Sequence, residues 1–398
     1  MSKVKFVVVF TVLINVIGLG IIIPVLPHYM ESFGASPFQV TLLFSVFALC
    51  SFISSPFLGT LSDRVGRRPI LIISIISTFL GWLVFASAKS MIFLFIGRII
   101  DGMAAGNISI AQSSLVDISK DNKERTNNLG LIGAAFGIGF IVGPLIGGLL
   151  STYSASTPFW FATGLALIDV IVAYFFLDET NRVSKKDTKL EWNPFLPLKR
   201  AALNRILLPS FFAWFFFIMA TSGIQATFAL YLQSAFNIQA FGAGMMLALM
   251  GVIIALNQIV ALKHFWLKYF AEPSIEFWMV LITGIGYFIM GGRLIMFFMI
   301  GLIITAFGQS VLRAVMTSQI VGNAPKEIRG EIIGITSSIM SVSMTIAPII
   351  AGALFIYKDS MPFTLSGIYM IIAFGIIFFN QKRLAKLKID ENVPLMCE

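Results

Sequence analysis

Several ionisable side chains stand inside long apolar runs, where charge is costly unless it is paired or hydrated. Arg98 and Asp101 lie three residues apart in the run 91–115, and Asp169 lies in the run 158–177. Residues three apart share a helix face, so Arg98 and Asp101 can form an ion pair. A carboxyl group in such surroundings can bind and release a proton, and ionisable residues within a membrane are candidates for function. The alternative for Arg98 and Asp101 is a structural ion pair whose charges neutralise each other.

A second cluster of charge lies between Gly59 and Pro69, in the sequence GTLSDRVGRRP. A stretch this charged cannot lie in hydrocarbon, so we expect it in water between two membrane spans. Gly66 would supply a tight turn, Gly59 a close approach of helices, and Asp63 an ion pair or a helix cap. Such a cluster can act as a latch that forms in one conformation and breaks in another. Alternatively, its charges only fix the orientation of the chain in the membrane.

The composition is that of an integral membrane protein. The chain has 398 residues, of which 58% are hydrophobic and 12% charged, whereas soluble domains are roughly 45–50% apolar and about 25% charged. The net charge of +9 does not indicate nucleic-acid binding, because the basic residues lie between the apolar runs rather than along one face. Cys50 and Cys397 have no metal-ligand spacing and are not expected to form a disulfide, so we expect neither a metal nor a cofactor.

Twelve apolar runs are long enough to cross a membrane, since about 20 apolar residues span the hydrocarbon. The predicted spans are 5–27, 38–61, 70–88, 91–115, 128–151, 158–177, 206–231, 240–262, 274–291, 294–318, 331–356 and 363–380. The first run imitates a signal peptide but lacks a cleavage pattern, so we expect it to remain as the first span. With the N-terminus in the cytoplasm, 23 of the 28 Lys and Arg residues fall on the cytoplasmic side, as the positive-inside rule requires. We therefore expect a protein of the plasma membrane, in bacteria the inner membrane, with both termini cytoplasmic.

The chain carries an internal repeat at a constant offset of 204 residues. Pairs at this offset include Arg125 and Arg329, Gly130 and Gly334, and Pro144 and Pro348. An offset that contains six spans gives two halves of the same orientation, with a substrate site between them. The predicted fold class is all-α, with twelve transmembrane helices in two six-helix bundles related by a parallel pseudo-two-fold axis. The predicted organisation is an N-terminal bundle at 1–177, a cytoplasmic linker at 178–205, a C-terminal bundle at 206–381 and a cytoplasmic tail at 382–398.

Further polar side chains within the spans are candidates for lining a substrate cavity, and hydrogen bonding between helices is an equally good account of each. They are Asn15, Gln112, Trp214, Gln225, Asn257, Gln258, Gln309 and Arg313. In spans nine to eleven we expect no functional acidic residue apart from Glu331, which stands near a helix end.

These features resemble the major facilitator superfamily, specifically the drug:proton antiporter branch that includes the tetracycline exporters. In that family the loop between spans two and three reads Gly-x-x-x-Asp-Arg-x-Gly-Arg-Arg, matched here by Gly59, Asp63, Arg64, Gly66, Arg67 and Arg68. The family also has an arginine at the position of Arg98, associated with proton handling, and the proton pathway implied by the resemblance depends mainly on Asp101. Asp117, Arg125 and Arg329 are expected to have structural roles in the loops.

The fifth span carries the series Gly139, Gly143, Pro144, Gly147 and Gly148. Small residues at this spacing give a helix a flat packing face, and the proline permits a bend. In the resembled family this series is the antiporter signature, which favours export over uptake. The alternative is a generic packing motif.

Asn15 departs from the tetracycline exporters, which have an acidic residue at its position. An asparagine can hydrogen-bond a substrate but cannot carry a proton at physiological pH.

The resemblance implies a secondary transporter, not an enzyme, that exports a small amphipathic, drug-like molecule in exchange for protons by alternating access. The chain has no phosphate-binding loop of the type Gly-x-x-x-x-Gly-Lys-Ser/Thr, so an ion gradient would supply the energy. The expected partners are the substrate, protons and the lipid bilayer, and the expected state is a monomer. One alternative is a major facilitator that transports a metabolite such as a siderophore, a sugar or an amino acid derivative. The other is a membrane receptor that transports nothing.

Overall fold

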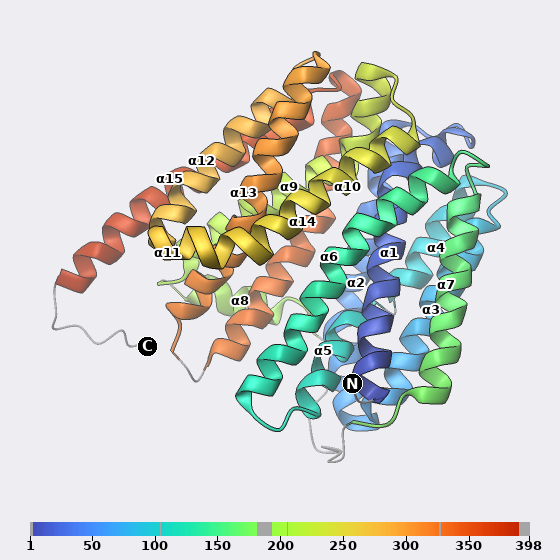
Figure 1. The fold of residues 1–398 in the computed structure, drawn as a ribbon, viewed down its shortest axis with the longest axis horizontal. Helices are drawn as coiled ribbons and strands as arrows, with labels where there is room; N and C mark the ends of the chain where they lie inside the picture. Colours follow the sequence, from blue (N-terminus) through green and yellow to red (C-terminus); the bar gives the residue numbers. More distant parts are fainter. Residues whose placement is uncertain (1–2, 104, 181–192, 205, 326–327, 390–398) are drawn as a thin grey trace. The chain divides into compact units, whose positions relative to one another are not determined.

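The computed structural model describes residues 3–103, 105–180, 193–204, 206–325 and 328–389, which form helices joined by short turns (Figure 1). Their contacts group into two compact units. The first unit comprises Met1–Pro194 and Phe228–Gly251, and the second comprises Phe195–Thr227 and Val252–Glu398. Most of the predicted linker, at 181–192 and 205, and the end of the predicted tail, at 390–398, lie outside the described residues. The predicted division into bundles at 1–177 and 206–381 stays a prediction.

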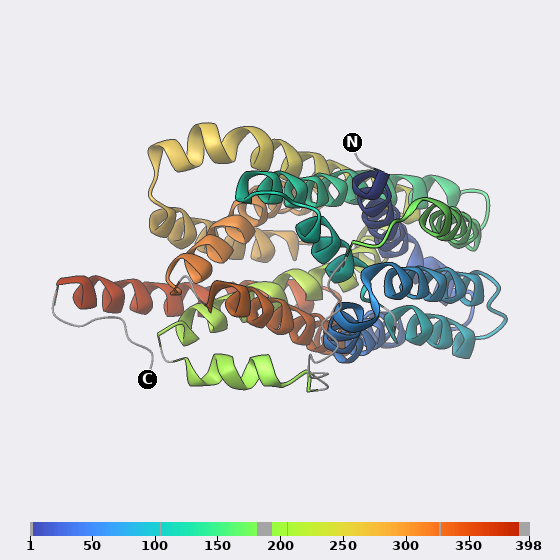
Figure 2. The ribbon, with the colours of Figure 1, turned by 90° about the horizontal axis from the view of Figure 1, so that it is seen from below.

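The first unit is built around its first helix. Its helices are α1 (Lys3–Glu31), α2 (Pro37–Val65), α3 (Arg67–Ala86), α4 (Met91–Met103), α5 (Asn107–Asp117), α6 (Asn122–Leu150) and α7 (Thr157–Phe176), with the end of α9 (Leu208–Phe236) and most of α10 (Ala240–Leu256). Helix α1 packs against α6 and α7, and Figure 2 shows it between them near its N-terminus. It is apolar all round, which is the pattern of a helix buried on every side. Val8, Val12 and Val16 of α1 therefore belong to the core of this unit.

The second unit contains the remaining helices. Its helices are α8 (Leu196–Leu203), the first part of α9, the π-helical segment η1 (Asn257–Trp266), α11 (Leu267–Tyr269), α12 (Glu272–Met290), α13 (Ile295–Gly322), α14 (Arg329–Tyr357) and α15 (Met361–Ile389). Helix α12 packs against α13 on one side and α15 on the other. Close approach is possible because Gly286 of α12 meets Thr305, and Gly301 of α13 meets Met290.

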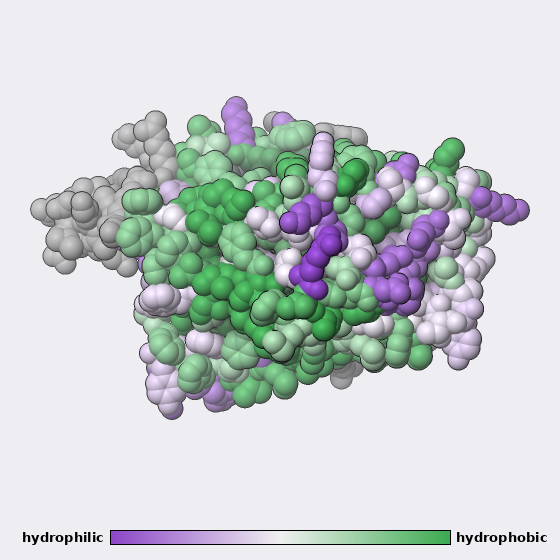
Figure 3. Space-filling model, turned by 90° about the horizontal axis from the view of Figure 1, so that it is seen from above, coloured by the Kyte–Doolittle hydropathy of each residue, from purple (hydrophilic) through white to green (hydrophobic). Residues whose placement is uncertain are grey.

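Twelve helices among the described residues are long and apolar enough to cross a membrane, which confirms the predicted count. Each overlaps its predicted span closely. Large apolar side chains such as Ile92 and Ile259 are exposed, and apolar residues dominate the visible surface in Figure 3. Such a surface suits lipid and not water. The chain is therefore an integral membrane protein.

Two local features differ from regular spans. The fourth span is interrupted between α4 and α5, where residues 105 and 106 form a turn, and the eighth span changes from α-helix to π-helix at Asn257. Helix α15 continues to Ile389, so the predicted tail begins inside a helix. Hydropathy indicates where apolar runs lie and not which kind of helix they form or where it ends, so the sequence pattern did not predict these features.

Candidate functional site

The loop between α2 and α3 is a single glycine that turns the chain. Gly66 has φ of 117°, a backbone conformation that side chains other than hydrogen rarely adopt. The first two amide groups of α3, those of Arg67 and Arg68, donate to the two carboxylate oxygens of Glu179 at 2.9 and 3.1 Å. A carboxylate at a helix N-terminus satisfies free amide groups and is favoured by the helix dipole. The chain turns at Gly66 as predicted. Of the two roles predicted for Asp63, the ion pair is present, with Arg67, and the cap of α3 is Glu179.

Arg67 is the centre of the charged cluster. Its guanidinium lies 2.6 Å from Asp63 and 3.0 Å from Asp117, and it donates to the hydroxyl of Ser62 at 2.6 Å. These contacts join the end of α2, the start of α3 and the end of α5. Only 11% of the Arg67 side chain is exposed, so its charge depends on these partners more than on water. The cluster can therefore be opened only by separating several charge-assisted bonds.

Replacing Arg67 with alanine is expected to lower the free energy of unfolding by about 2 kcal/mol, because two carboxylates and a buried hydroxyl lose a charged partner. The measurement is the melting temperature of the purified protein in detergent. Arg125→Ala is the matched control, since Arg125 is exposed at the start of α6, and such a change is expected to stay within about 0.5 kcal/mol. Equal melting temperatures for the two variants would contradict the central place of Arg67.

The other residues of the cluster have separate surroundings. The guanidinium of Arg68 donates to the carbonyl of Tyr174 at 2.9 Å, and Arg64 is half-buried. A methyl group added at Gly59 would meet no atom within 4 Å, so the expected close helix contact at Gly59 is not present. Among the predicted loop charges, Asp117 pairs with Arg67, and Arg329 donates to the carbonyl of Ala324 at 3.4 Å.

At the start of α6, a short ion pair joins the first and fifth spans. Lys5 lies 2.6 Å from Glu124, whose other oxygen accepts the amide of Lys120 at 3.0 Å. The bond from Lys5, followed by the amide of Lys120, holds the pKa of the Glu124 carboxyl below its usual range. Sequence patterns did not single out this pair.

Arg98 and Asp101 form the predicted ion pair inside the first unit. The guanidinium of Arg98 lies 3.3 Å from the Asp101 carboxylate, and the two residues are only 4% and 7% exposed. Three aromatic rings surround the guanidinium, with centroids at 4.6 Å for Trp82, 5.1 Å for Phe85 and 5.6 Å for Phe47. The negative faces of such rings stabilise a cation that has left water. One nitrogen of Arg98, Nη2, has no hydrogen-bond partner among the described residues.

A chain of polar groups continues from this pair. The Asp101 carboxylate accepts a bond from the hydroxyl of Thr78, and that hydroxyl accepts the side-chain amide of Asn107 at 3.0 Å. Asn107 stands at the first turn of α5, directly after the interruption of the fourth span. The pair is thus linked to the point where this span departs from a regular helix.

Asp169 lies apart from this pair and binds to the first helix. Its Oδ1 atom accepts the hydroxyl of Thr11 at 2.8 Å, and its Oδ2 atom has no partner among the described residues. Asp169 is 1% exposed. Burying a carboxyl group with only one hydrogen-bonded oxygen costs free energy of folding. We therefore expect the bond from the Thr11 hydroxyl to stabilise the folded protein.

Replacing Thr11 with valine keeps the shape of the side chain and removes the hydrogen bond that the described residues donate to Asp169. We expect a lower free energy of unfolding by about 1–3 kcal/mol, the usual result of leaving a buried polar group without a partner. Thr163→Val is the matched control, because the hydroxyl of Thr163 bonds only to Phe159 of its own helix. Thermal unfolding in detergent measures both variants. If the melting temperature of Thr163→Val fell as much as that of Thr11→Val, the hydrogen bond from Thr11 to Asp169 would not be the cause of the loss.

The glycine series of α6 packs against the backbone of α1. A methyl group added at Gly143 would lie 2.6 Å from the carbonyl oxygen of Ile17, and one at Gly147 would lie 2.8 Å from that of Ile21. One at Gly139 would strike Val16. On its other side, Gly148 meets the backbone of Ala240 in α10. The glycine series therefore allows close contacts of α6 with two helices of the first unit, α1 and α10. In the contact with α10, the carbonyl of Pro144 also meets Gly244.

In the second unit, three of the predicted cavity residues bond to neighbouring helices. Trp214 is 5% exposed and donates to the carbonyl of Thr336 at 3.2 Å. Asn257 donates to the hydroxyl of Ser310 at 2.6 Å, and Gln258 to the carbonyl of Ser310 at 3.1 Å. For these three residues, the structure therefore shows hydrogen bonds between helices, which was the alternative to lining a substrate cavity.

Gln309 and Arg313 of α13 have a different position. The exposed apolar row of this helix is Met296, Ile300, Ile303 and Phe307. At 3.6 residues per turn, Arg313 lies about 120° around the helix from that row, on the face of Gln309. Arg313 is exposed, with no ion pair among the described residues, and Gln309 donates to the hydroxyl of Tyr287 at 2.9 Å. This polar face points away from the row that suits lipid.

The remaining candidates are dispersed. Asn15 is half-buried in α1, and its side chain reaches the carbonyl of Thr11 at 3.5 Å. Gln112 is exposed on α5, and Gln225 is half-buried in α9.

The structure also reveals an acidic residue that the sequence analysis missed. Glu276 stands one turn inside α12, is 8% exposed, and was not among the predicted site residues. The available signal was its position within the predicted span 274–291. Glu331, by contrast, lies at a helix start and pairs with Arg200 at 3.3 Å.

Comparison with known proteins decides the family. The model of the Major Facilitator Superfamily matches residues 8–271. The chain belongs to this superfamily. This major facilitator is 28% identical to the quinolone resistance protein NorA of Staphylococcus aureus (strain MSSA476), over 99% of this chain and 100% of that protein. It is also 28% identical to the tetracycline resistance protein, class H, of Pasteurella multocida, over 96% of this chain and 98% of that protein.

A solved structure shares the fold. The human organic anion transporter MFSD10 superimposes with a TM-score of 0.72 at 21% identity, covering 94% of this chain and 99% of that one. The predicted fold class, an all-α membrane protein with twelve spans, is therefore confirmed, and so is the predicted resemblance to the branch of the tetracycline exporters. The chain is a major facilitator transporter embedded in a membrane.

Proposed function

We propose that this major facilitator is a secondary exporter that moves a small amphipathic, drug-like molecule out of the cell in exchange for protons. Two bundles, 1–177 and 206–381, alternate in opening a shared site to either side of the membrane. Both termini lie in the cytoplasm, the protein acts as a monomer, and the linker 178–205 joins the bundles on the cytoplasmic side. The names of the relatives, which refer to quinolone and tetracycline resistance, support a drug-like substrate.

The observation that carries the proposal is the buried pair of Arg98 and Asp101. A guanidinium held by three aromatic rings stays charged when the carboxylate takes up a proton, because the rings compensate part of the lost attraction. Protonation of Asp101 therefore changes the net charge of this site from zero to positive. A change of charge in a buried site alters the relative stability of two conformations that hydrate the site differently.

The cluster around Arg67 serves as the conformational latch of this cycle. Its bonds join three helix ends through one side chain, so a displacement of α5 breaks the bond to Asp117 while those to Asp63 and Ser62 of α2 remain. The polar face of Gln309 and Arg313 supports a site in the second bundle that contacts substrate. An unpaired guanidinium there favours substrates with an anionic or zwitterionic group.

A transport assay in proteoliposomes tests the function. A fluoroquinolone and a tetracycline are the probes, with an imposed pH gradient, no gradient, or a gradient collapsed by a protonophore. Uptake that requires the gradient supports the antiporter. Uptake that is independent of it indicates a facilitator. If neither probe is taken up but a siderophore, sugar or amino acid derivative is taken up with the gradient, the substrate is a metabolite and not a drug-like molecule. Protein-free liposomes are the control.

A further inference from the structure

Helix α5 is a separate segment of the fourth span, 11 residues long. Residues 105 and 106 form a turn before it, and the amide of Ala105 donates to the carbonyl of Gly102, three positions back. The same carbonyl accepts the hydroxyl of Ser54 in α2 at 3.0 Å. Bonds from side chains to the backbone are a usual cause of a break in a helix. The chain is therefore less stiff before α5 than it is within a continuous helix.

Polar bonds tie both ends of α5 to α3, and the two helices pack against each other. At the first residue of α5, the side-chain amide of Asn107 donates to the hydroxyl of Thr78 at 3.0 Å. At its last residue, the carboxylate of Asp117 lies 3.0 Å from Nε of Arg67. At 1.5 Å per residue, the bonded positions are about 15 Å apart along each helix. Helix α5 is thus held to one neighbour at two points.

Between these two points the packing of α5 is mainly apolar. Ile110, Ala111 and Leu115 belong to the core of the first unit, and the side-chain amide of Asn128 reaches the carbonyl of Leu115 at 3.4 Å. Apolar contacts have no preferred direction. The bonds at the two ends therefore determine where α5 lies along α3, and a displacement of this helix strains both of them together.

The bond at Asn107 is linked to the charge of Asp101 through one hydroxyl group. The amide nitrogen of Asn107 can only donate, so the oxygen of Thr78 accepts from it, and the hydroxyl hydrogen remains for the Asp101 carboxylate. A hydrogen bond to a charged acceptor is about twice as strong as one to a neutral acceptor, and bonds in a chain strengthen one another. The bond that holds the first residue of α5 is therefore strongest while Asp101 is charged.

Thr78 is the group that holds the Asn107 side chain. The other polar atom of that side chain, Oδ1, is buried without a hydrogen-bond partner among the described residues, and Asn107 is 2% exposed. Water therefore does not replace Thr78 when its bond weakens.

We propose that Thr78 and Asn107 are positioning residues through which the charge of Asp101 controls the bond between Asp117 and Arg67, with α5 as the moving part. The inference rests on the proposed roles of Asp101 as the proton carrier and of the Arg67 cluster as the latch. While Asp101 is charged, the polar chain holds α5 where Asp117 reaches Arg67. When Asp101 takes up a proton, the hold on one end of α5 weakens, and the bond at the other end opens more often. Because coupling is reciprocal, opening of that bond favours the protonated form of Asp101.

The test is hydrogen–deuterium exchange of the purified protein in lipid nanodiscs at one fixed pH, followed at the amides of residues 115–118 in the last turn of α5. Thr78→Val keeps the shape of the side chain and removes both of its bonds. We expect these amides to exchange about fivefold faster, the usual effect of one lost hydrogen bond on an opening equilibrium. Thr78→Ser restores the hydroxyl and is expected to stay within about twofold of the wild type. Faster exchange confined to residues 110–112 would overturn the proposal, since the change would then not reach Asp117.

Asn107→Ala cuts the same chain from the side of α5 and is expected to give the same acceleration, so the test does not depend on Thr78→Val alone. Unchanged exchange at residues 115–118 in both variants would refute α5 as the connection. No substrate or proton gradient is present in this measurement. Absence of transport would therefore leave the result intact, and unchanged exchange would leave the proposed export function standing.

Asp101→Asn connects the test with the proton. This variant gives Thr78 a neutral acceptor, as a bound proton does, and we expect exchange at residues 115–118 to be about threefold faster. Combined with Thr78→Val it should add nothing, whereas independent effects would add. Asp169→Asn is the matched control, because it neutralises a buried carboxyl whose bond goes to Thr11 and not to α5. Additive effects in the double variant, or an equal acceleration by Asp169→Asn, would contradict the proposed connection.

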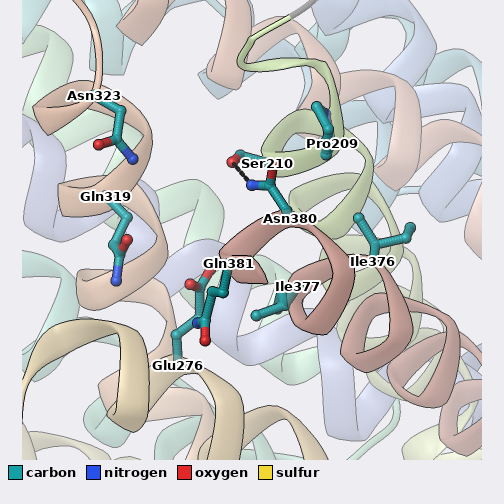
Figure 4. A pocket seen from close by; sticks show the side chains of 9 residues that line it. All are labelled: Pro209, Ser210, Glu276, Gln319, Asn323, Ile376, Ile377, Asn380 and Gln381. Atoms are coloured by element: carbon teal, nitrogen blue, oxygen red, sulfur yellow. Dashed lines mark hydrogen bonds between the residues drawn. The ribbon is translucent and has the colours of Figure 1, made fainter. Parts of the chain in front are cut away.

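A matched control for the loss of the hydroxyl lies in the second unit, beside a small polar cavity (Figure 4). There the side-chain amide of Asn380 donates to the hydroxyl of Ser210 at 3.3 Å, and its Oδ1 atom has no partner among the described residues, as for Asn107. Ser210→Ala removes this bond and should leave exchange at residues 115–118 within about twofold. If Ser210→Ala accelerated that exchange as much as Thr78→Val, any lost bond would loosen α5, and the specific connection to Asp101 would be wrong.

Discussion

Replacing Asp101 with asparagine is expected to reduce pH-driven transport at least tenfold while substrate still exchanges across the membrane without a gradient. Asparagine keeps the size of the side chain and its bond to Thr78 but cannot bind a proton. The site then stays positive in every step, so a proton gradient no longer biases one conformation over the other. The measurement pairs gradient-driven uptake with counterflow of labelled against unlabelled substrate in the same proteoliposomes.

Counterflow separates loss of coupling from loss of structure. Asp101→Asn also leaves Arg98 without its anion, and breaking a buried ion pair costs about 3–5 kcal/mol, so the protein must first be shown to be folded. Asp359→Asn is the matched control, because Asp359 also pairs with an arginine, Arg293, at 3.2 Å. It stands in the turn between α14 and α15 and not within a span. Gradient-driven uptake retained by Asp101→Asn would rule out this carboxyl as the proton carrier.

Gly143→Val is expected to have the largest effect on the fold. Its Cβ atom would lie 2.6 Å from the carbonyl oxygen of Ile17 and 2.9 Å from the Cα atom of Gly20. Both neighbours are backbone atoms of α1, the helix at the core of the first unit, so neither can turn aside. Forcing extra atoms into a packed contact typically costs about 1–3 kcal/mol, and more when backbone must move. We expect a large fall in melting temperature and loss of transport.

Gly137→Val in the same helix is the control for this variant. A methyl group at Gly137 would meet no atom within 4 Å, and both changes introduce the same β-branched side chain into the same helix. The difference between the two melting temperatures therefore reports the contact with α1 alone. Similar values for Gly137→Val and Gly143→Val would mean that the close approach of α1 and α6 does not matter for stability.

The sequence predicted the spans well because hydropathy over some twenty residues is a strong signal. The predicted runs 91–115 and 331–356 correspond to the observed Met91–Asp117 and Glu331–Tyr357. The spacing of three residues also predicted the ion pair of Arg98 and Asp101, since helix geometry alone brings the two side chains together.

The partners of the site residues could not be predicted in the same way. Thr11 and Asp169 are 158 residues apart in the chain, and Glu179 reaches the amides of α3 across more than 100 residues. Such contacts depend on how helices pack, which composition and periodicity do not encode. The role of Trp214 was also beyond the sequence. An aromatic side chain can line a cavity or pack against a neighbouring helix, and the sequence does not distinguish these two roles.

The π-helical segment in the eighth span changes how that helix should be aligned with related chains. Up to this segment, exposed side chains recur every three or four positions, at Met245, Leu249, Val252 and Leu256. Within it, the exposed positions fall in two groups, at 258–260 and at 264–265. A wider turn accommodates an additional residue per repeat. A gap of one residue placed near Asn257 would therefore keep the outward-facing positions of two chains in phase, whereas an ungapped alignment would equate side chains that point in different directions.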